Sequence, residues 1–514
     1  MLRFLARVLL TSWGMLSWIS CAPVSSIDPQ SSVADGLAGK SWGEVYALEP
    51  AREFDLSASS AEKRTFNDFA LTSTGDHLYL AGTFYDDAIE KYQGVIRTYQ
   101  SEQGWGGEGS GSSGFTDSSQ NFDHVGLISS SAGEVLALFS RGGAGPTPMT
   151  SVLGRNGGWL QTWSVNLSDL PEYPDATERL SLGPVYQGAF DPLGQVRFAL
   201  GFEKESYEYL YQRSHHQGVI EELKYDAAEG SSTTASHLIL SDGVGTTCQT
   251  FENRASPSDA RSLQIACRVF AEDTIEETEL VASAEYEQLE TLGHDGASDG
   301  QGLLVYIAYR EIAGEWVVTA NTVLEGAVSD PVEISAGMTE LGYSAAAAES
   351  AEDWNQAARP RIVYLGNHRF LVVWQGVAAL SSGGKVSQLF SAVYNSWQDE
   401  WSQAEPIGEE RAYSVLPAHY GFSLFANQDD NAGVAINRVD ADTGQVHTLE
   451  VARFHEAAGW QEFNEFGAGC DASVSLRQCS MTPQGAILNT GQTVVAFVDQ
   501  DEEGVFRLMG VNFE

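Results

Sequence analysis

Beyond residue 40 the chain alternates between short apolar runs and clusters of Gly, Asp, Asn and Ser. The apolar runs are about five to eight residues long, as in "HLYLAGTF" (77–84) and "RFLVVWQG" (369–376), and this is typical of β-strands. No long stretch repeats its apolar residues at the helical spacing of three and four. The pattern therefore predicts an all-β protein.

One unit of this pattern recurs along the chain: a strand, a polar turn that usually contains Gly, and a bulky residue that opens the next strand. "GVIRTYQSEQGW" ends at Trp105 and "EVARFHEAAGW" ends at Trp460. The same unit ends at Trp159, Trp316 and Trp401, and in a variant at Val219. Another apolar run precedes each unit, so the repeat contains several strands and predicts a β-propeller.

The segments at the two ends of the chain together supply one complete repeat unit. The C-terminal "TVVAFVDQDEEGVFRLMGVNFE" supplies two strands of a unit without its Trp segment, and "SWGEVYALEP" (41–50) carries Trp42. We expect the N-terminal strand to pair with the C-terminal strands in one blade, because closure removes a free sheet edge. The seven anchor positions predict seven blades. Six to eight are possible, because the long intervals from 219 to 316 and from 316 to 401 could contain insertions, or one of them an eighth blade.

The tryptophans of the repeat, Trp42, Trp105, Trp159, Trp316, Trp401 and Trp460, are predicted to be blade-core residues. A large aromatic side chain fills the space between blades that diverge outward. Stacking on carbohydrate is the alternative role for these side chains.

The N-terminus has the features of an export signal. Arg3 and Arg7 precede a short apolar stretch over 8–19, and "WISCAP" (18–23) resembles a bacterial lipobox with Cys21 as the lipidated residue. The predicted organisation is a signal peptide over 1–21, a flexible tether over 22–40 and a single propeller over 41–514. A plain secreted protein is the alternative. Ala22 after the cysteine, rather than Asp, favours outer-membrane sorting, with the periplasmic and the surface face both open.

Five cysteines are present, so lipidation of Cys21 leaves an even number in an exported protein, which favours two disulfides. Cys248 and Cys267 flank a turn-rich segment and could face each other across a hairpin. Cys470 and Cys479 would close a small loop. A metal site is disfavoured, because neither a CxxC pair nor a His ligand has suitable spacing.

The charge is strongly acidic: Lys and Arg number 28 and Asp and Glu 70, which gives a net charge of −42 at pH 7. This argues against sequence-independent binding to nucleic acid and against electrostatic docking on anionic lipid. No apolar stretch long enough to span a membrane follows the signal, so membrane attachment would depend on the lipid. A protein or a glycan is the expected partner.

Motifs that carry chemistry are weak. Asp499 and Asp501 in "VDQDEEG" resemble the start of a calcium-binding loop, but a hairpin turn explains these residues better. Calcium is the one cofactor that the sequence suggests. The adjacent His215 and His216 would point to opposite faces of a strand, which makes them a poor chelate. Four longer segments, 163–183, 285–302, 325–358 and 461–484, exceed simple turns and are the candidate binding loops.

The Gly-Trp repeats resemble those of uncharacterised bacterial secreted proteins and lipoproteins, a resemblance that implies a propeller and no particular activity. Sialidase-type propellers are similar in shape, but "SEQGW" (101–105) lacks the aspartate of their Asp-box. We therefore expect an envelope-anchored binding or scaffold protein without catalysis. The alternative is a glycoside hydrolase or lyase that uses carboxylates in the propeller funnel.

Overall fold

The structure is a computed structural model that describes residues 41–514 with gaps, the longest being 49–64, 107–121, 141–148, 166–180, 226–237, 254–261, 276–293, 346–358, 413–420 and 470–480. The chain divides between Lys40 and Ser41 into two units, and all described residues belong to the second. The predicted signal peptide, Cys21 and the tether lie outside the described residues. Among the described residues no helix is long and apolar enough to cross a membrane.

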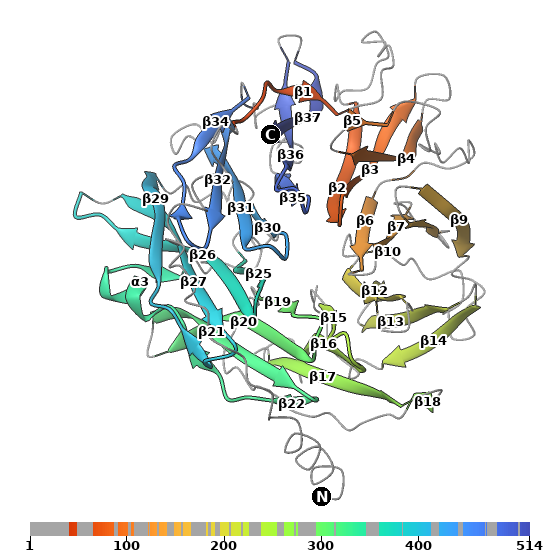
Figure 1. The fold of residues 1–514 in the computed structure, drawn as a ribbon, viewed down its shortest axis with the longest axis horizontal. Helices are drawn as coiled ribbons and strands as arrows, with labels where there is room; N and C mark the ends of the chain where they lie inside the picture. Colours follow the sequence, from red (N-terminus) through yellow and green to blue (C-terminus); the bar gives the residue numbers. More distant parts are fainter. Residues whose placement is uncertain are drawn as a thin grey trace, which may run out of the picture. The chain divides into compact units, whose positions relative to one another are not determined.

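The described strands form eight antiparallel sheets, which are the blades of a β-propeller (Figure 1). Blade 1 contains β2 (Phe66–Thr74), β3 (His77–Asp86), β4 (Lys91–Gln100) and β5 (Gly104–Trp105). Blade 2 contains β6 (His124–Ser129), β7 (Glu134–Ser140), β8 (Met149–Arg155) and β9 (Gly158–Val165). Blade 3 contains β10 (Ser181–Leu182), β11 (Gln187–Phe190), β12 (Val196–Lys204), β13 (Tyr207–His216) and β14 (Val219–Tyr225).

Blade 4 contains β15 (Ile239–Ser241), β16 (Thr246–Asn253), β17 (Ser262–Ala271) and β18 (Thr274–Ile275). Blade 5 contains β19 (His294–Ser298), β20 (Leu303–Ile312), β21 (Glu315–Leu324), β22 (Ala327–Val328) and β23 (Val332–Glu333), and the short helix α3 (Ala336–Glu340) follows it. Blade 6 contains β24 (Ser344–Ala345), β25 (Arg361–Gly366), β26 (Arg369–Ala379), β27 (Lys385–Asn395), β28 (Glu400–Trp401) and β29 (Glu405–Ala412).

Blade 7 contains β30 (Phe422–Ala426), β31 (Asn431–Val439), β32 (Val446–His455), β33 (Gly459–Trp460) and β34 (Asn464–Phe466). Blade 8 contains β35 (Gln484–Ile487), β36 (Thr493–Gln500), β37 (Phe506–Phe513) and, from the other end of the chain, β1 (Tyr46–Ala47). The innermost strands contact one another in the order β2, β6, β11, β15, β19, β25, β30, β35 and back to β2, which closes the ring.

The predicted closure of the ring by the chain ends is confirmed. In β1, Tyr46 and Ala47 pair with Gly510 and Met509 of β37, and Trp42 forms a bridge with Phe513. Leu48 extends the contact through its N–H, which donates to the carbonyl of residue 508 at 2.9 Å. Blade 8 therefore combines strands from both ends of the chain, and β1 covers the edge of β37.

The preferred count of seven blades is corrected to eight among the described residues, which is still within the predicted range. The additional sheet is blade 4, inside the long interval between 219 and 316. Its fourth strand carries Ile275 where other blades have Trp, and Trp316 opens the third strand of blade 5 instead of the fourth. The predicted number of blades was too low because the turn followed by an aromatic residue does not mark fourth strands alone. The same pattern also occurs at the hairpin between a second and a third strand.

The repeat tryptophans whose side chains are described are half-buried at the edges of the core clusters. In four blades the tryptophan on the outer strand contacts an aromatic ring of the neighbouring strand. The pairs are Trp105 with Tyr99, Trp401 with Tyr394, Trp460 with Phe454, and Trp42 with Phe513. Ring centroids in these pairs lie 4.8–5.4 Å apart, so each outer strand is held by an aromatic pair.

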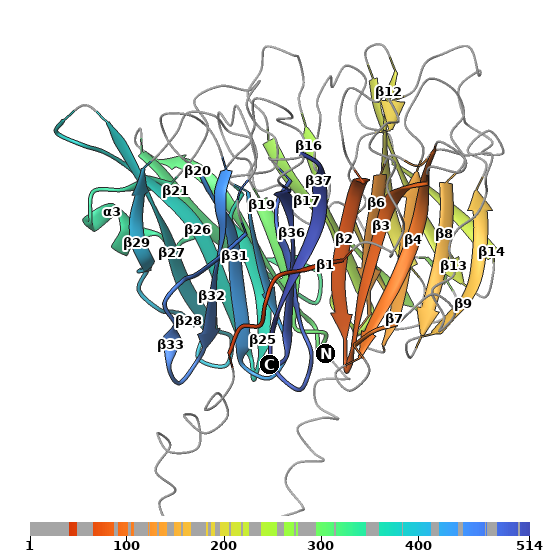
Figure 2. The same cartoon turned by 90° about the horizontal axis from the view of Figure 1, so that it is seen from above.

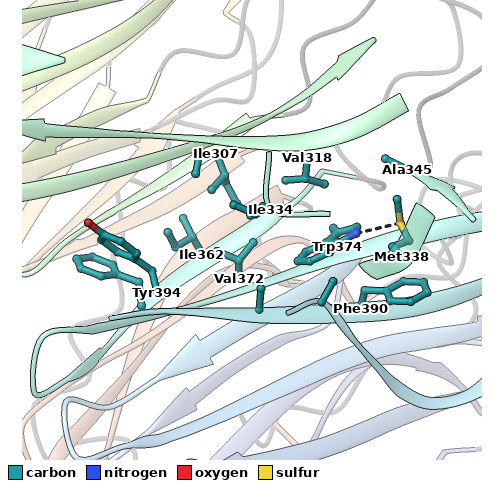
Figure 3. Packing of buried hydrophobic residues seen from close by; sticks show 14 of the residues in the cluster. Ile307, Val318, Ile334, Met338, Ala345, Ile362, Val372, Trp374, Phe390 and Tyr394 are labelled. Atoms are coloured by element: carbon teal, nitrogen blue, oxygen red, sulfur yellow. Dashed lines mark hydrogen bonds between the residues drawn. The ribbon is translucent and has the colours of Figure 1, made fainter. Parts of the chain in front are cut away.

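The deepest packing lies between blades rather than at the repeat tryptophans. Trp374 of β26 is fully buried, stacks 6.3 Å from Phe390, and donates its Nε1–H to the sulfur of Met338 in α3 (Figure 3). The same cluster includes Val318 of blade 5, so it joins two blades. Second strands such as β26 are therefore near-continuous apolar runs, because both of their faces pack against a neighbouring blade.

The predicted hairpin partners Cys248 and Cys267 lie directly opposite each other, in β16 and β17. Cross-strand positions of this kind have the short Cα separation that a disulfide requires. A disulfide between them remains a prediction. Cys470 and Cys479 lie outside the described residues.

Candidate functional site

The propeller has two different faces, which follow from its antiparallel sheets (Figure 2). Turns from first to second strands and from third to fourth strands lie at one end of the blades, and most are tight, such as 75–76 and 367–368. We call this end the short-turn face. The turns between second and third strands lie at the opposite face, and much of the length of the predicted binding loops lies outside the described residues. Ser41 pairs with Glu514 at the end of a third strand, so it lies at the short-turn face.

The candidate calcium residues take part in a hairpin turn. Asp501 accepts the N–H of Val505 at 2.9 Å through Oδ1 and pairs with Arg507 at 2.7 Å through Oδ2. Asp499 accepts the N–H of Gln500 at 3.0 Å. In the described part of the chain no group of three or more His, Cys, Asp or Glu residues is placed to hold a metal ion. His215 and His216 are the last two residues of β13.

The innermost strands carry polar side chains that join successive blades. Asp68 of β2 accepts the N–H of Val125 in β6 at 3.0 Å, and Asp295 of β19 accepts the N–H of Ile362 in β25 at 3.2 Å. Gln484 of β35 accepts the N–H of Leu71 at 2.9 Å, which links blade 8 to blade 1. Desolvation raises the pKa of Asp295, against the opposing effect of Arg361. These carboxyl and amide groups act as links between blades.

A different arrangement stands out on the short-turn face of blade 6. Trp397 is 79% exposed, and it is the only exposed aromatic side chain among the residues whose burial is described. It belongs to the turn between β27 and β28. The side chain of Asn395 accepts the N–H of Trp397 at 3.1 Å and that of Gln398 at 3.2 Å, so the turn is built around this asparagine.

The neighbouring turn of the same blade supports Trp397. Asn367 and His368 both have positive φ values, 47° and 63°, which form the tight two-residue turn between β25 and β26. The carbonyl of His368 accepts the N–H of Ser396 at 2.8 Å and its hydroxyl at 3.0 Å. The imidazole of His368 lies 5.7 Å from the indole of Trp397 at an angle of 45°.

Acidic side chains of blade 7 bind the turn that contains Asn367 and Arg369. Asn367 donates to Asp430 at 3.0 Å, and Arg369 binds the same carboxylate at 2.9 Å. Arg369 also pairs with Glu456 in the turn between β32 and β33. We call the four turns 366–369, 395–400, 427–431 and 455–459 the Trp397 cluster. Their mutual bonds hold the exposed indole on a prearranged surface, which reduces the ordering cost of binding.

The chemistry of the Trp397 cluster is that of recognition. The four turns carry one exposed indole and five carboxylates, which are Asp399, Glu400, Asp429, Asp430 and Glu456. The only cation of the four turns besides histidine is Arg369, and both of its ion pairs are within the cluster. The surface is therefore suited to a ligand without negative charge.

Reasoning from the repeat did not single out Trp397. It lies in "NSWQDEW" (395–401), and the repeat assigned the structural role to Trp401 and the polar turn to the residues before it. The available signal was a second tryptophan in a turn, where no strand pattern requires an aromatic residue. The bonds from blade 7 had no signal in the sequence.

Comparison with known proteins gives likeness of fold only. No protein family model matches the sequence. No curated protein matches it either. Solved structures with a similar fold include the BP39L lectin from Burkholderia pseudomallei, 12% identical, with 78% of this chain and 100% of the lectin covered and a TM-score of 0.42.

The β-propeller domain of the Trilobed protease from Pyrococcus furiosus is 10% identical, with 78% of this chain and 96% of that domain covered and a TM-score of 0.41. Prolyl oligopeptidase B from Galerina marginata is also 10% identical, with a TM-score of 0.43, and the match covers 88% of this chain and 56% of the enzyme. The class of the protein, a β-propeller, follows from the closed ring of eight described sheets. Likenesses at this level of identity indicate no ligand and no activity.

Proposed function

We propose that this chain is an exported, lipid-anchored β-propeller that binds a ligand at the short-turn face without transforming it. The observation that carries the proposal is Trp397, a highly exposed indole that is held by hydrogen bonds between four turns of two blades. Soluble proteins bury most large aromatic side chains, and an exposed one on a fixed polar surface is characteristic of a contact site.

The export part of the proposal depends on the N-terminal sequence. Cys21 would carry the lipid, and a flexible tether over 22–40 would have a root-mean-square length of about 25 Å. The propeller would begin at Ser41 on the short-turn face, the face that carries Trp397. Such a tether allows the contact surface to reach partners near the membrane without being pressed against it.

Catalysis in the funnel, the alternative function, would need carboxylates that are free to act on a substrate. Asp295 has the raised pKa that such a mechanism uses, but its carboxylate accepts the N–H of Ile362 between blades 5 and 6. Asp68 is engaged in the same way by Val125. These bonds favour the binding function.

Two experiments test the proposal with the full chain. Fatty-acid labelling of cells should mark the wild type and not the Cys21→Ser variant, and persistent labelling would refute the lipid anchor. Crosslinking in intact envelopes should capture a ligand that the Trp397→Ala variant loses. Leu324→Ala is the matched control, because Leu324 is 58% exposed at the end of β21, directly before the corresponding turn of blade 5. Equal capture by all three proteins would refute the binding site.

A further inference from the structure

The composition of the Trp397 cluster indicates what kind of ligand it suits. The buried centre of a protein interface is more apolar than its rim. The other exposed side chains of the four turns are polar apart from two alanines: Asn367, Gln398, Asp399, Glu400, Gln428, Asp429, Glu456, Ala457 and Ala458. A single indole in a polar surround suits a ligand that is itself polar at its periphery and has one apolar face. A sugar ring has this form, because its C–H groups gather on one face and its hydroxyl groups lie around the edge.

The next two residues of the turn after Trp397 carry hydrogen-bonding side chains. Gln398 accepts a bond from the side chain of Asn395 at 2.9 Å through Oε1, and its Nε2 donor has no partner among the described residues. Asp399 accepts the hydroxyl of Tyr394 at 2.7 Å through Oδ1, and its second oxygen has no described partner. A donor and an acceptor are therefore fixed beside Trp397, the combination that orients a hydroxylated ligand.

The negative charge of the Trp397 cluster further limits which classes of ligand it suits. Asp399, Glu400, Asp429 and Glu456 are all exposed in the four turns of the cluster, and Arg369 is paired within the cluster. Like charge repels uronates and sulfated sugars, and it favours neutral sugars or sugars with a protonated amine.

We propose that the Trp397 cluster binds neutral or amino-sugar glycans, with a sugar ring stacked on the indole of Trp397 and its hydroxyl groups held by Gln398 and Asp399. This inference rests on the proposed function, since it names the ligand class of the same surface. The imidazole of His368 contacts the indole at a centroid distance of 5.7 Å, and Trp397 remains 79% exposed, which leaves room for the sugar.

The test uses the full chain, in detergent if the N-terminus is acylated, on an array of neutral, amino-sugar, uronate and sulfated glycans. Dissociation constants of the glycans bound by the wild type are then measured for Trp397→Ala, Gln398→Ala and the matched control Leu324→Ala. Released sugar is assayed in the same samples. We expect binding to neutral or amino-sugar glycans, weakened about tenfold or more by Trp397→Ala and unchanged by Leu324→Ala. Gln398→Ala should have a smaller effect of the same sign.

Each result other than the expected one refutes a specific part of the two proposals. Binding confined to uronate or sulfated glycans, or equal binding by wild type and Trp397→Ala, refutes the glycan inference. No glycan binding, together with a protein crosslink that Trp397→Ala loses, refutes the glycan class and leaves the proposed binding surface in place. Released sugar refutes the proposed function, because the protein would then be an enzyme. Absence of both glycan binding and crosslinks refutes both proposals.

Discussion

Replacement of Leu48 by Ala tests whether the N-terminal segment stabilises the whole propeller. Leu48 is 0% exposed and belongs to the core cluster shared by blades 8 and 1. Its side chain lies over Gly510 of β37, where a Cβ added to the glycine would come within 2.8 Å of the leucine Cγ. Truncation therefore leaves a cavity that the closely packed strand cannot fill.

The expected cost follows from burial and cavity formation. A fully buried Leu→Ala change lowers the free energy of unfolding by about 2–5 kcal/mol. The backbone bonds of Leu48, to residue 508 at 2.9 Å and from Arg97 at 2.6 Å, remain possible in the variant. The loss should therefore stay within that range and should not abolish folding.

The assay is urea unfolding followed by tryptophan fluorescence, with the shift in midpoint multiplied by a common m-value. Leu324→Ala is the control, because the same change at a 58% exposed position should alter the free energy of unfolding by less than about 0.5 kcal/mol. Equal stability of the two variants would show that the N-terminal segment is not part of the cooperative core. Amide exchange at Tyr46 and Ala47 should be faster in Leu48→Ala, since these residues pair with β37.

Three further changes have definite expected results. Gly366→Ala should lower the melting temperature more than Gly342→Ala: both glycines have positive φ, but only at Gly366 would the new Cβ collide, with the carbonyl of Gln428. Oxidised wild type should contain a disulfide between Cys248 and Cys267, and its loss in the double Ser variant should cost about 2–4 kcal/mol. Burial raises the pKa of Tyr46 from 10.0 to about 12, so the free energy of unfolding should fall as the pH rises from about 10 to 12, and less steeply in Tyr46→Phe.

For each of these three changes, one specific result would contradict the expectation. Equal melting temperatures for the two glycine variants would contradict the close approach of blades 6 and 7. Two free thiols per chain at these positions, counted in the unfolded oxidised protein after the other cysteines are replaced, would exclude the disulfide. For Tyr46, the free energy of unfolding falls with rising pH because the hydroxyl loses its proton at a lower pH in the unfolded state than in the folded state. This ionisation stabilises the unfolded state. A wild type whose urea midpoint is constant from pH 9 to 12 would contradict the burial of this hydroxyl.

Much of the fold could be predicted from the sequence because it depends on local interactions. Strands and hairpins follow from apolar alternation and turn residues. The missing segment of the last unit indicated that the N-terminal segment with Trp42 pairs with the C-terminal strands, and in the structure Trp42 forms its bridge with Phe513. The blade count was less certain, because Ile275 can occupy the outer strand of blade 4 where other blades use Trp. The backbone register of Ile275 opposite Phe270 matches that of the tryptophans in other blades, so the repeat signal disappears while the blade remains.

The candidate site required the tertiary structure. The sequence contains Trp397, but only the fold leaves it exposed while Trp401, four positions later, packs on Tyr394. Asn367 and Asp430 are distant in sequence, and they meet because adjacent blades bring their turns to one face. The sequence by itself determined which segments become strands and how the ring closes. Exposure and the bonds between turns depend on how blades pack against each other, which local sequence does not encode.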